Sequence, residues 1–461
     1  MAVATEKPNP LKGKGGLIAV GAVILLGVVL MFDFKAPESR DPDSTPRMTE
    51  YLRFRAAELD RVEVKREDGG FTLLRKGRNW TIDQPRNYRA NPTSVDNWLK
   101  GLLDDAFISR QVDSKPGALA DYGLDKPAAE LVLHHGSETR TLKIGSDFRL
   151  PGATAPGNSF YALEPADGRL FLITSSQADD VKKKKLDDLR DKRLMEIAEE
   201  KNCKSLLIRG AAVTEVRRVG DNWELSQPFR APAEKWDVES LLAMLRTSES
   251  DGFAADEAPD LAEFGLDKPQ LQLEVEDNTG KHALLLGKEN GSGKIFAVRG
   301  GEREVFLVPK TTLDNLNKKP SDLRERRMVT LERDKIRRLE VQNAHGTIRL
   351  EKTGDGWNFA TAANAPMKQA KADAAQKLVD AATTPALRHV EEAPTDLARH
   401  GLDAPLLTIT LSDGVGSSQV LKIGRPKGDP HYYAKGQTNA VYEIQGFVFT
   451  DLDVKPEALN P

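Results

Sequence analysis

The stretch Tyr122–Pro127, YGLDKP, returns as FGLDKP at 264–269 and as HGLDAP at 400–405. Glycine tolerates a positive φ, and aspartate bonds nearby backbone N–H groups, so both residue types are typical of turns. Proline cannot continue a helix and favours an extended residue before it. The phrase therefore predicts a turn that leads into a strand. The positions that define the turn are Gly123, Leu124, Asp125, Pro127, Gly265, Leu266, Asp267, Pro269, Gly401, Leu402, Asp403 and Pro405.

Four further markers accompany this turn, each time in the same order. A tryptophan comes 43, 42 and 44 residues before the turn glycine, and the phrases LKIG, LLLG and LKIG end 22, 22 and 23 residues after it. Two aromatic segments follow, first FYAL, IFAV or YYAK and then LFLI, VFLV or VYEI. Such fixed periods are typical of tandem repeats. The sequence therefore predicts three homologous units, each with a buried structural tryptophan: Trp80, Trp223 and Trp357.

Each unit begins with a strand-like alternation of apolar residues, as at Val62 and Val64. A helix with a core-facing apolar stripe follows the tryptophan. Several short strands complete the unit, and the absence of long βαβ alternation favours antiparallel over parallel sheets. We therefore expect an α+β fold with mostly antiparallel strands. The three repeat units are placed at residues 48–194, 195–328 and 329–461.

The N-terminal segment contains an apolar run without charges. Residues 15–32, GGLIAVGAVILLGVVLMF, number 18, which is about enough to cross a hydrocarbon core of roughly 30 Å. Lysines precede the run and acidic residues follow it, so the positive-inside rule predicts a cytoplasmic segment at 1–14 and a transmembrane anchor at 15–34. Residues 35–47 are Pro-rich and predict an extended tether. We expect a single-pass bacterial inner-membrane protein whose bulk is periplasmic. A cleaved signal peptide is the alternative, although no small-residue cleavage site follows the run.

The composition excludes several function classes. The chain has 67 basic and 70 acidic residues and a net charge of -3, so charge gives no reason to expect a nucleic-acid partner. The 7 histidines show no zinc-type spacing, and Cys203, the sole cysteine, occupies a slot that Leu59 and Ile336 fill in the other units. The segment GKENGSGKI at 287–295 lacks the glycine spacing of a phosphate loop. No group recurs beside the turn aspartates as a catalytic partner. We therefore predict no catalytic residue, cofactor or metal site, and no enzymatic activity.

A charged motif closes the first two units. DLRDKRL occupies 188–194 and DLRERRM occupies 322–328, whereas the third unit ends in TDLDVKPEALNP without an arginine cluster. Arginine forms forked bonds to carboxylates, and the stability of a tandem array depends on contacts between neighbouring units. The motif therefore predicts an inter-repeat junction; the alternative is a solvated, charge-rich helix end. The junction residues are Asp188, Arg190, Arg193, Asp322, Arg324 and Arg327.

The combination of an N-terminal anchor, the YGLDKP-type turn, LKIG and an aromatic strand resembles the bacterial domain of unknown function 4340 family, across roughly residues 48–461. The third unit departs from the pattern with His400 in the aromatic slot and Ala404 in the lysine slot. The resemblance implies no established activity or cofactor. It implies a membrane-anchored extracytoplasmic protein that partners an ABC-type transporter of the gliding-motility kind, with its permease, ATPase and auxiliary subunit.

Three functions follow from these observations, in order of preference. The first is a non-enzymatic accessory or scaffold component of an ABC-type transport system. The alternative is a cell-envelope polysaccharide-binding module. An unrecognised hydrolase ranks third, because the sequence offers no catalytic constellation.

Overall fold

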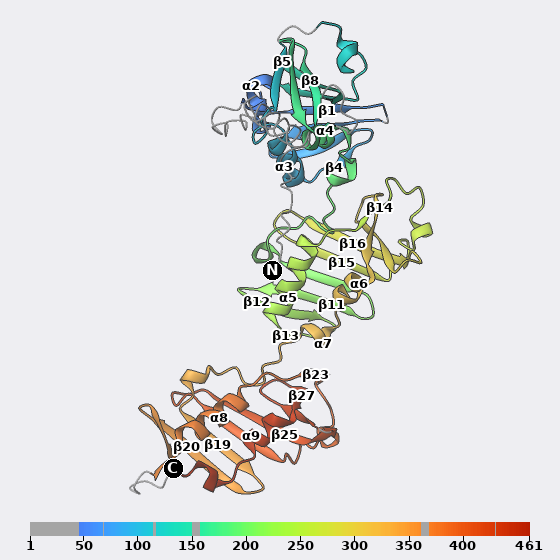
Figure 1. Ribbon diagram of the computed structural model, residues 1–461. Helices are drawn as coiled ribbons and strands as arrows, with labels where there is room; N and C mark the ends of the chain where they lie inside the picture. The colour runs from blue at the N-terminus through green and yellow to red at the C-terminus, as the bar shows by residue number, and fades with distance from the viewer. Residues whose placement is uncertain (1–45, 68, 114–116, 150–156, 361–367, 429) are drawn as a thin grey trace, which may run out of the picture. The chain divides into compact units, whose positions relative to one another are not determined.

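The computed structural model describes residues 46–67, 69–113, 117–149, 157–360, 368–428 and 430–461. Within these ranges the chain forms three nine-stranded sheets, one for each repeat (Figure 1). It divides into two compact units, Met1–Asp191 with one sheet and Lys192–Pro461 with two. The prediction of three tandem repeats is confirmed.

The first repeat begins with α2 (Met48–Leu52) and the 3-10 helix η2 (Ala56–Glu58). Its strands are β1 (Arg61–Lys65), β2 (Phe71–Lys76), β3 (Asn79–Gln84), β4 (Tyr88–Arg89), β5 (Arg110–Asp113), β6 (Ala129–His135), β7 (Glu138–Phe148), β8 (Ser159–Glu164) and β9 (Arg169–Thr174). Its remaining helices are α3 (Pro92–Leu102), η3 (Leu119–Tyr122), α4 (Ser175–Lys182) and η4 (Leu186–Asp188).

The second repeat has the same order of elements. Its strands are β10 (Ser205–Arg209), β11 (Val213–Val219), β12 (Asn222–Gln227), β13 (Ala231–Ala233), β14 (Gly252–Ala255), β15 (Leu271–Glu276), β16 (Lys281–Glu289), β17 (Lys294–Arg299) and β18 (Val305–Pro309). Its helices are η5 (Glu200–Asn202), α5 (Lys235–Thr247), η6 (Leu261–Phe264), α6 (Lys310–Leu316) and α7 (Pro320–Leu323).

The third repeat follows this order once more. Its strands are β19 (Arg338–Asn343), β20 (Gly346–Thr353), β21 (Gly356–Phe359), β22 (Lys368–Gln369), β23 (Arg388–Glu392), β24 (Leu407–Ser412), β25 (Ser418–Gly428), β26 (His431–Lys435) and β27 (Ala440–Gln445). Its helices are η7 (Arg333–Lys335), α8 (Ala372–Ala382), η8 (Ala398–His400), α9 (Gly446–Leu452) and η9 (Pro456–Leu459).

The three sheets share one topology. The first has the strand order β4-β3-β2-β1-β6-β7-β8-β9-β5, and the other two repeat it as β13 to β14 and β22 to β23. Two four-stranded antiparallel meanders meet where β1 pairs with β6, with Val62 opposite Leu133. The chain crosses from the first meander to the second by way of α3 and β5, and β5 pairs with β9 at the far edge. One face of each central strand is buried, because burial alternates along β1, β10 and β19.

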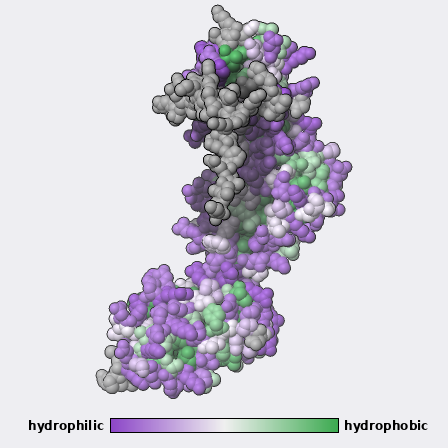
Figure 2. Space-filling view, viewed as in Figure 1, coloured by the Kyte–Doolittle hydropathy of each residue, from purple (hydrophilic) through white to green (hydrophobic). Residues whose placement is uncertain are grey.

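Helices cover the buried face of each sheet. Figure 1 shows α5 and α6 against the second sheet and α8 and α9 against the third. In the first repeat the predicted apolar stripe of α3 is buried, and it consists of Val95, Trp98, Leu99 and Leu102. Trp80, Trp223 and Trp357 belong to the three main cores. The face drawn in Figure 2 is mostly hydrophilic, as a chain with 30% charged residues leads one to expect.

The predicted α+β class is wrong, because the fold is mostly β. The main helices of the repeats have 11, 13 and 11 residues, whereas each sheet has nine strands. Apolar stripes make these helices prominent in the sequence. Edge strands such as β4, with 2 residues, and β13, with 3, are too short to show the alternation by which a strand is recognised.

The predicted transmembrane anchor, residues 15–34, lies outside the described residues, as do residues 1–14 and 35–45. Among the residues that the structure does describe, no helix is long and apolar enough to cross a membrane. The longest of these helices, α5, has 13 residues, which span about 20 Å against the roughly 30 Å of a hydrocarbon core. This finding contradicts the predicted single-pass inner-membrane placement with a periplasmic bulk, and we set that placement aside.

The buried tryptophans give a test of the core. Trp223 is 1% exposed and Trp236 in the same repeat is 73% exposed. We expect Trp223→Ala to lower the free energy of unfolding by about 3–5 kcal/mol, because it removes a large side chain from a packed interior. Trp236→Ala is the matched control and should change stability by less than about 0.5 kcal/mol. Urea unfolding followed by circular dichroism measures both. Equal effects of the two substitutions would contradict the assignment of Trp223 to the core.

Candidate functional site

The recurring turn has the same backbone geometry in all three repeats. It ends the 3-10 helices η3, η6 and η8 with a left-handed glycine: φ is 65° at Gly123, 67° at Gly265 and 66° at Gly401. In the first repeat the Gly123 N–H donates to the Ala120 carbonyl at 3.0 Å, and the Leu124 N–H donates to the Leu119 carbonyl at 3.0 Å. The leucine after the glycine is buried each time: Leu124, Leu266 and Leu402.

A second glycine, the last residue of the LKIG-type phrase, lies against this turn. A Cβ on Gly145 would be 2.2 Å from the Tyr122 carbonyl oxygen, and Gly287 and Gly424 would meet Phe264 and His400 at the same 2.2 Å. Real Cβ atoms do not come so close, so only glycine fits there. Each of these glycines lies at a β-bulge, where the pairing with the next strand shifts register. We call this backbone-to-backbone contact of turn and bulge the glycine lock.

The glycine lock explains why two phrases keep a nearly fixed spacing. The contact is reciprocal, because a Cβ on Gly123 would lie 2.9 Å from the Ser146 backbone nitrogen. One residue more or less between turn and bulge would move the second glycine out of register and place a side chain in the gap. The sequence recorded this spacing, but it assigned the second glycine no role.

An aromatic contact fastens the turn from its other side. Tyr122 lies edge-to-face on Tyr161 with ring centroids 5.0 Å apart, and the matching contacts in the other repeats are Phe264–Phe296 at 4.9 Å and His400–Tyr433 at 4.6 Å. His400 therefore replaces the aromatic ring in kind, and burial lowers its pKa. The turn prolines Pro127, Pro269 and Pro405 are half-buried, whereas Asp125, Asp267 and Asp403 are exposed to solvent. The phrase thus packs through its ring, glycine and leucine.

The repeated tryptophans also make matched polar contacts. The indole N–H of Trp80 donates to Asp96 at 2.8 Å, and that of Trp223 donates to Glu239 at 3.4 Å, each acceptor lying on the following helix. Arg75 lies over the ring of Trp80 at 4.5 Å and Arg218 over that of Trp223 at 4.4 Å. A buried indole with its N–H satisfied is a structural arrangement rather than a ligand-stacking one.

At the end of the second repeat, Arg324 contacts the third repeat directly. Its guanidinium makes a forked pair with the Glu392 carboxylate of β23, at 2.7 Å and 3.2 Å, and lies 5.4 Å from the Tyr442 ring centroid. The side chain is 1% exposed. The backbone around it is paired on both sides, because Glu325 N donates to the Pro232 carbonyl and Ala386 N donates to the Arg326 carbonyl. This segment is thus hydrogen-bonded to both repeats.

The other predicted junction residues have more local contacts. Arg327 pairs with Glu325 at 2.7 Å, is 57% exposed, and has its pKa raised by that hydrogen bond. Asp322 accepts the Lys319 N–H at 2.8 Å and so caps α7. In the first repeat Arg190 is buried over the Tyr88 ring at 4.2 Å and pairs with Asp187 at 3.1 Å. Asp188 is exposed at the end of η4, and Arg193 is half-buried and forms an isolated bridge with Glu249.

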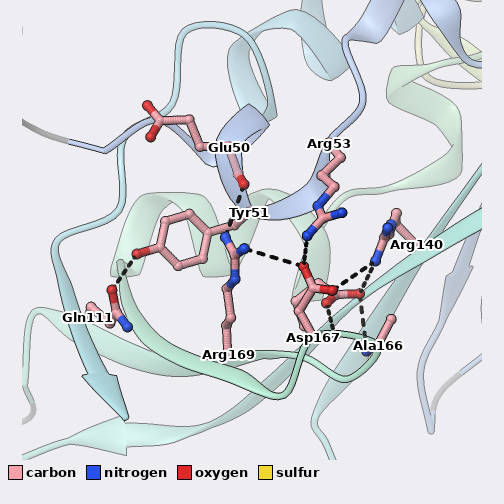
Figure 3. Close-up of polar contacts among 9 residues, drawn as sticks. Glu50, Tyr51, Arg53, Gln111, Arg140, Ala166, Asp167 and Arg169 are labelled. Carbon is pink, nitrogen blue, oxygen red and sulfur yellow. Dashed lines mark hydrogen bonds and ion pairs between the residues drawn. The ribbon is translucent and has the colours of Figure 1, made fainter. Parts of the chain in front are cut away.

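A polar cluster fixes the leading segment of the first repeat to its sheet (Figure 3). Asp167 pairs with Arg53 at 2.6 Å, with Arg169 at 3.4 Å and with Arg140 at 3.6 Å. Arg140 also pairs with the fully buried Glu164 at 3.6 Å. Each guanidinium thus has a carboxylate partner, and the side chains in Figure 3 converge on Asp167. Because its charges satisfy one another, the cluster reads as a structural clamp rather than an open anion site.

The described residues offer little nucleophilic or metal chemistry. Cys203 is 1% exposed, and burial raises the pKa of its thiol to about 11. A thiol with so high a pKa is almost wholly protonated at neutral pH and is therefore inert. Within the described ranges, no group of three or more His, Cys, Asp or Glu side chains is placed to hold a metal ion.

The fold and its lock define a class of protein, a tandem array of nine-stranded antiparallel repeats. A sequence model described as Domain of unknown function (DUF4340) matches residues 80–221, 223–387 and 377–459. The chain therefore belongs to this family, as its motifs predicted. No curated protein matches the chain.

The glycine lock predicts a strong steric effect at one of its members. Gly145→Ala should destabilise the first repeat by about 1–3 kcal/mol or more, because the added methyl has no space beside the Tyr122 carbonyl. Gly101→Ala is the control within the same repeat. Its Cβ meets nothing within 4 Å, and in helix α3 it should stabilise by up to about 1 kcal/mol. Chemical unfolding of both variants measures the difference. A Gly145→Ala protein as stable as the parent would contradict the lock.

The junction predicts a contrast between two neighbouring arginines. Arg324→Ala leaves Glu392 without its buried partner and should cost about 3 kcal/mol, so that the third repeat melts apart from the second. Arg327→Ala removes an exposed arginine and should change stability by less than about 0.5 kcal/mol. Differential scanning calorimetry of the full chain distinguishes one transition from two. A single unshifted transition in Arg324→Ala would refute the junction role of this side chain.

Proposed function

We propose that this chain is a non-enzymatic accessory or scaffold component of an ABC-type transport system. The observation that carries the proposal is the use of the recurring residues. The turn, the second glycine and the tryptophan all make contacts inside their own repeat. Residues that recur for packing build a scaffold, and tandem scaffolds work through extended surfaces. In an enzyme, by contrast, a repeated motif brings reactive groups together at a cleft.

The partners in this proposal are a permease, an ATPase and a large auxiliary subunit. The resemblance of the motifs to the family suggests them. The near balance of charge, with 67 basic against 70 acidic residues, is consistent with protein rather than nucleic-acid partners. A polysaccharide-binding module is the alternative function, and the exposed Trp236 is the specific observation in its favour.

Reconstitution tests the transport proposal. The tagged full-length chain is co-expressed with the transporter subunits encoded beside it and purified in mild detergent. We expect permease and ATPase to elute with the tagged chain in a fixed ratio, and the ratio to survive high salt. The same subunits expressed with an unrelated tagged protein are the control. Elution of the chain alone, from cells in which permease and ATPase still assemble with each other, would contradict the proposal.

A further inference from the structure

One tryptophan is placed unlike the three core tryptophans. Trp236 lies in the first turn of α5 and is 73% exposed. When the buried stripes of the main helices are aligned, the same position holds Thr93 in α3 and Asp373 in α8. The fold therefore does not need an aromatic side chain there. A large apolar side chain held in water is costly, and it marks a binding surface when other features gather around it.

A pocket of about 500 Å³ opens beside Trp236. This volume lies within the range of small-ligand sites, which is roughly 300–1,000 Å³. The walls come from α5, from the segment around α7 and from the start of β23. Hydrogen-bonding side chains supply much of the wall, among them Asp237, Ser240, Asn315 and Ser321. The site thus combines one exposed aromatic ring with several polar groups.

These walls fit a small polar ligand better than a protein partner. The cores of protein interfaces are depleted of Lys, Asp and Ser, and these are the residue types found here at Lys318, Asp237 and Ser240. A ligand that suits the pocket presents an apolar face to the indole and hydroxyl groups to the walls. A pyranose ring has both, because its C–H bonds gather on one face and its hydroxyls lie around the edge.

The charges of the pocket indicate a neutral ligand. Arg326 is paired with Asp237 at 3.2 Å, and Arg388 is paired with Glu443 at 2.8 Å. Because their charges are already offset, these two guanidinium groups contribute little net field for a phosphate or a carboxylate. Hydroxyl groups still accept bonds from them and donate bonds to Asp237.

We propose that this pocket binds a neutral saccharide, with one sugar ring stacked on Trp236 and its hydroxyls bonded to Asp237, Ser240 and Asn315. The inference stands apart from the transport proposal, because the pocket can bind a sugar with or without transporter subunits. The exposed indole also supplies a spectroscopic signal of its own.

Calorimetry and tryptophan fluorescence test the site with the full-length chain. The probes are maltoheptaose, cellohexaose and chitohexaose, with oligogalacturonate and ATP as anionic controls. We expect at least one neutral oligosaccharide to bind, with affinity unchanged between low and high salt, as binding without ion pairing requires. Trp236→Thr installs the residue of the first repeat, and it should weaken that binding by about tenfold or more through loss of the aromatic contact. Phe447→Ala, which removes a 51% exposed aromatic in the third repeat, should leave binding unchanged.

Each other outcome overturns the proposal. Absence of binding across the neutral panel contradicts it, and so does sugar binding that is equal in Trp236→Thr and the parent. Preference for the anionic probes with steep salt dependence would assign the pocket to charged ligands instead. If Trp236→Thr changes only the recovery of transporter subunits, the surface is a protein-docking site. Failure of the transporter to co-purify leaves the sugar measurement unaffected, so the two proposals fail separately.

Discussion

The contact on which each repeat depends is the one between two stretches of backbone that leave no space for a Cβ. Gly145 lies against the Tyr122 carbonyl, and the same contact recurs at Gly287 and Gly424. It fixes the turn to the bulge of the sheet and thereby sets where the second meander begins. The aromatic contact and the buried leucine then fill the remaining space around the turn. A sequence that keeps both glycines and their spacing keeps the sheet in register.

Much of this arrangement was predictable from the sequence, because the contact is local enough to preserve spacing. Five markers in constant order predicted three repeats and the family. The fold class was not predictable in the same way. Strands such as β4 and β22 owe their existence to pairing with a neighbour rather than to their own residues, and two residues carry no periodic signal. The prominent helical stripe of α3 led the interpretation toward α+β. The membrane prediction rested on residues 15–34, outside the described part of the chain, and no helix among the described residues supports it.

The junction shows where sequence reasoning stops. The motif DLRERRM indicated that arginines join neighbouring repeats, and Arg324 does pair with Glu392. The partner is 68 residues away in sequence, and nothing in the spacing selects it over other acidic residues. Arg327 occurs in the same motif, yet it turns back to Glu325. Which of two similar side chains is buried depends on the packing of both repeats, and a single motif does not record that. Trp236 was overlooked for the opposite reason, since it occurs in one repeat and thus carries no repeated signal.

The central claim is that the turn and the sheet of each repeat form one cooperative unit through the glycine lock. Native-state hydrogen exchange of the full chain, resolved by residue, tests it most directly. The amides of Leu124, Leu266 and Leu402, which donate within the turn, are predicted to exchange with the same opening free energy as the central strand amides of their own repeats. Turn amides that exchange freely while the sheet amides stay protected would show that the lock does not hold the repeat together.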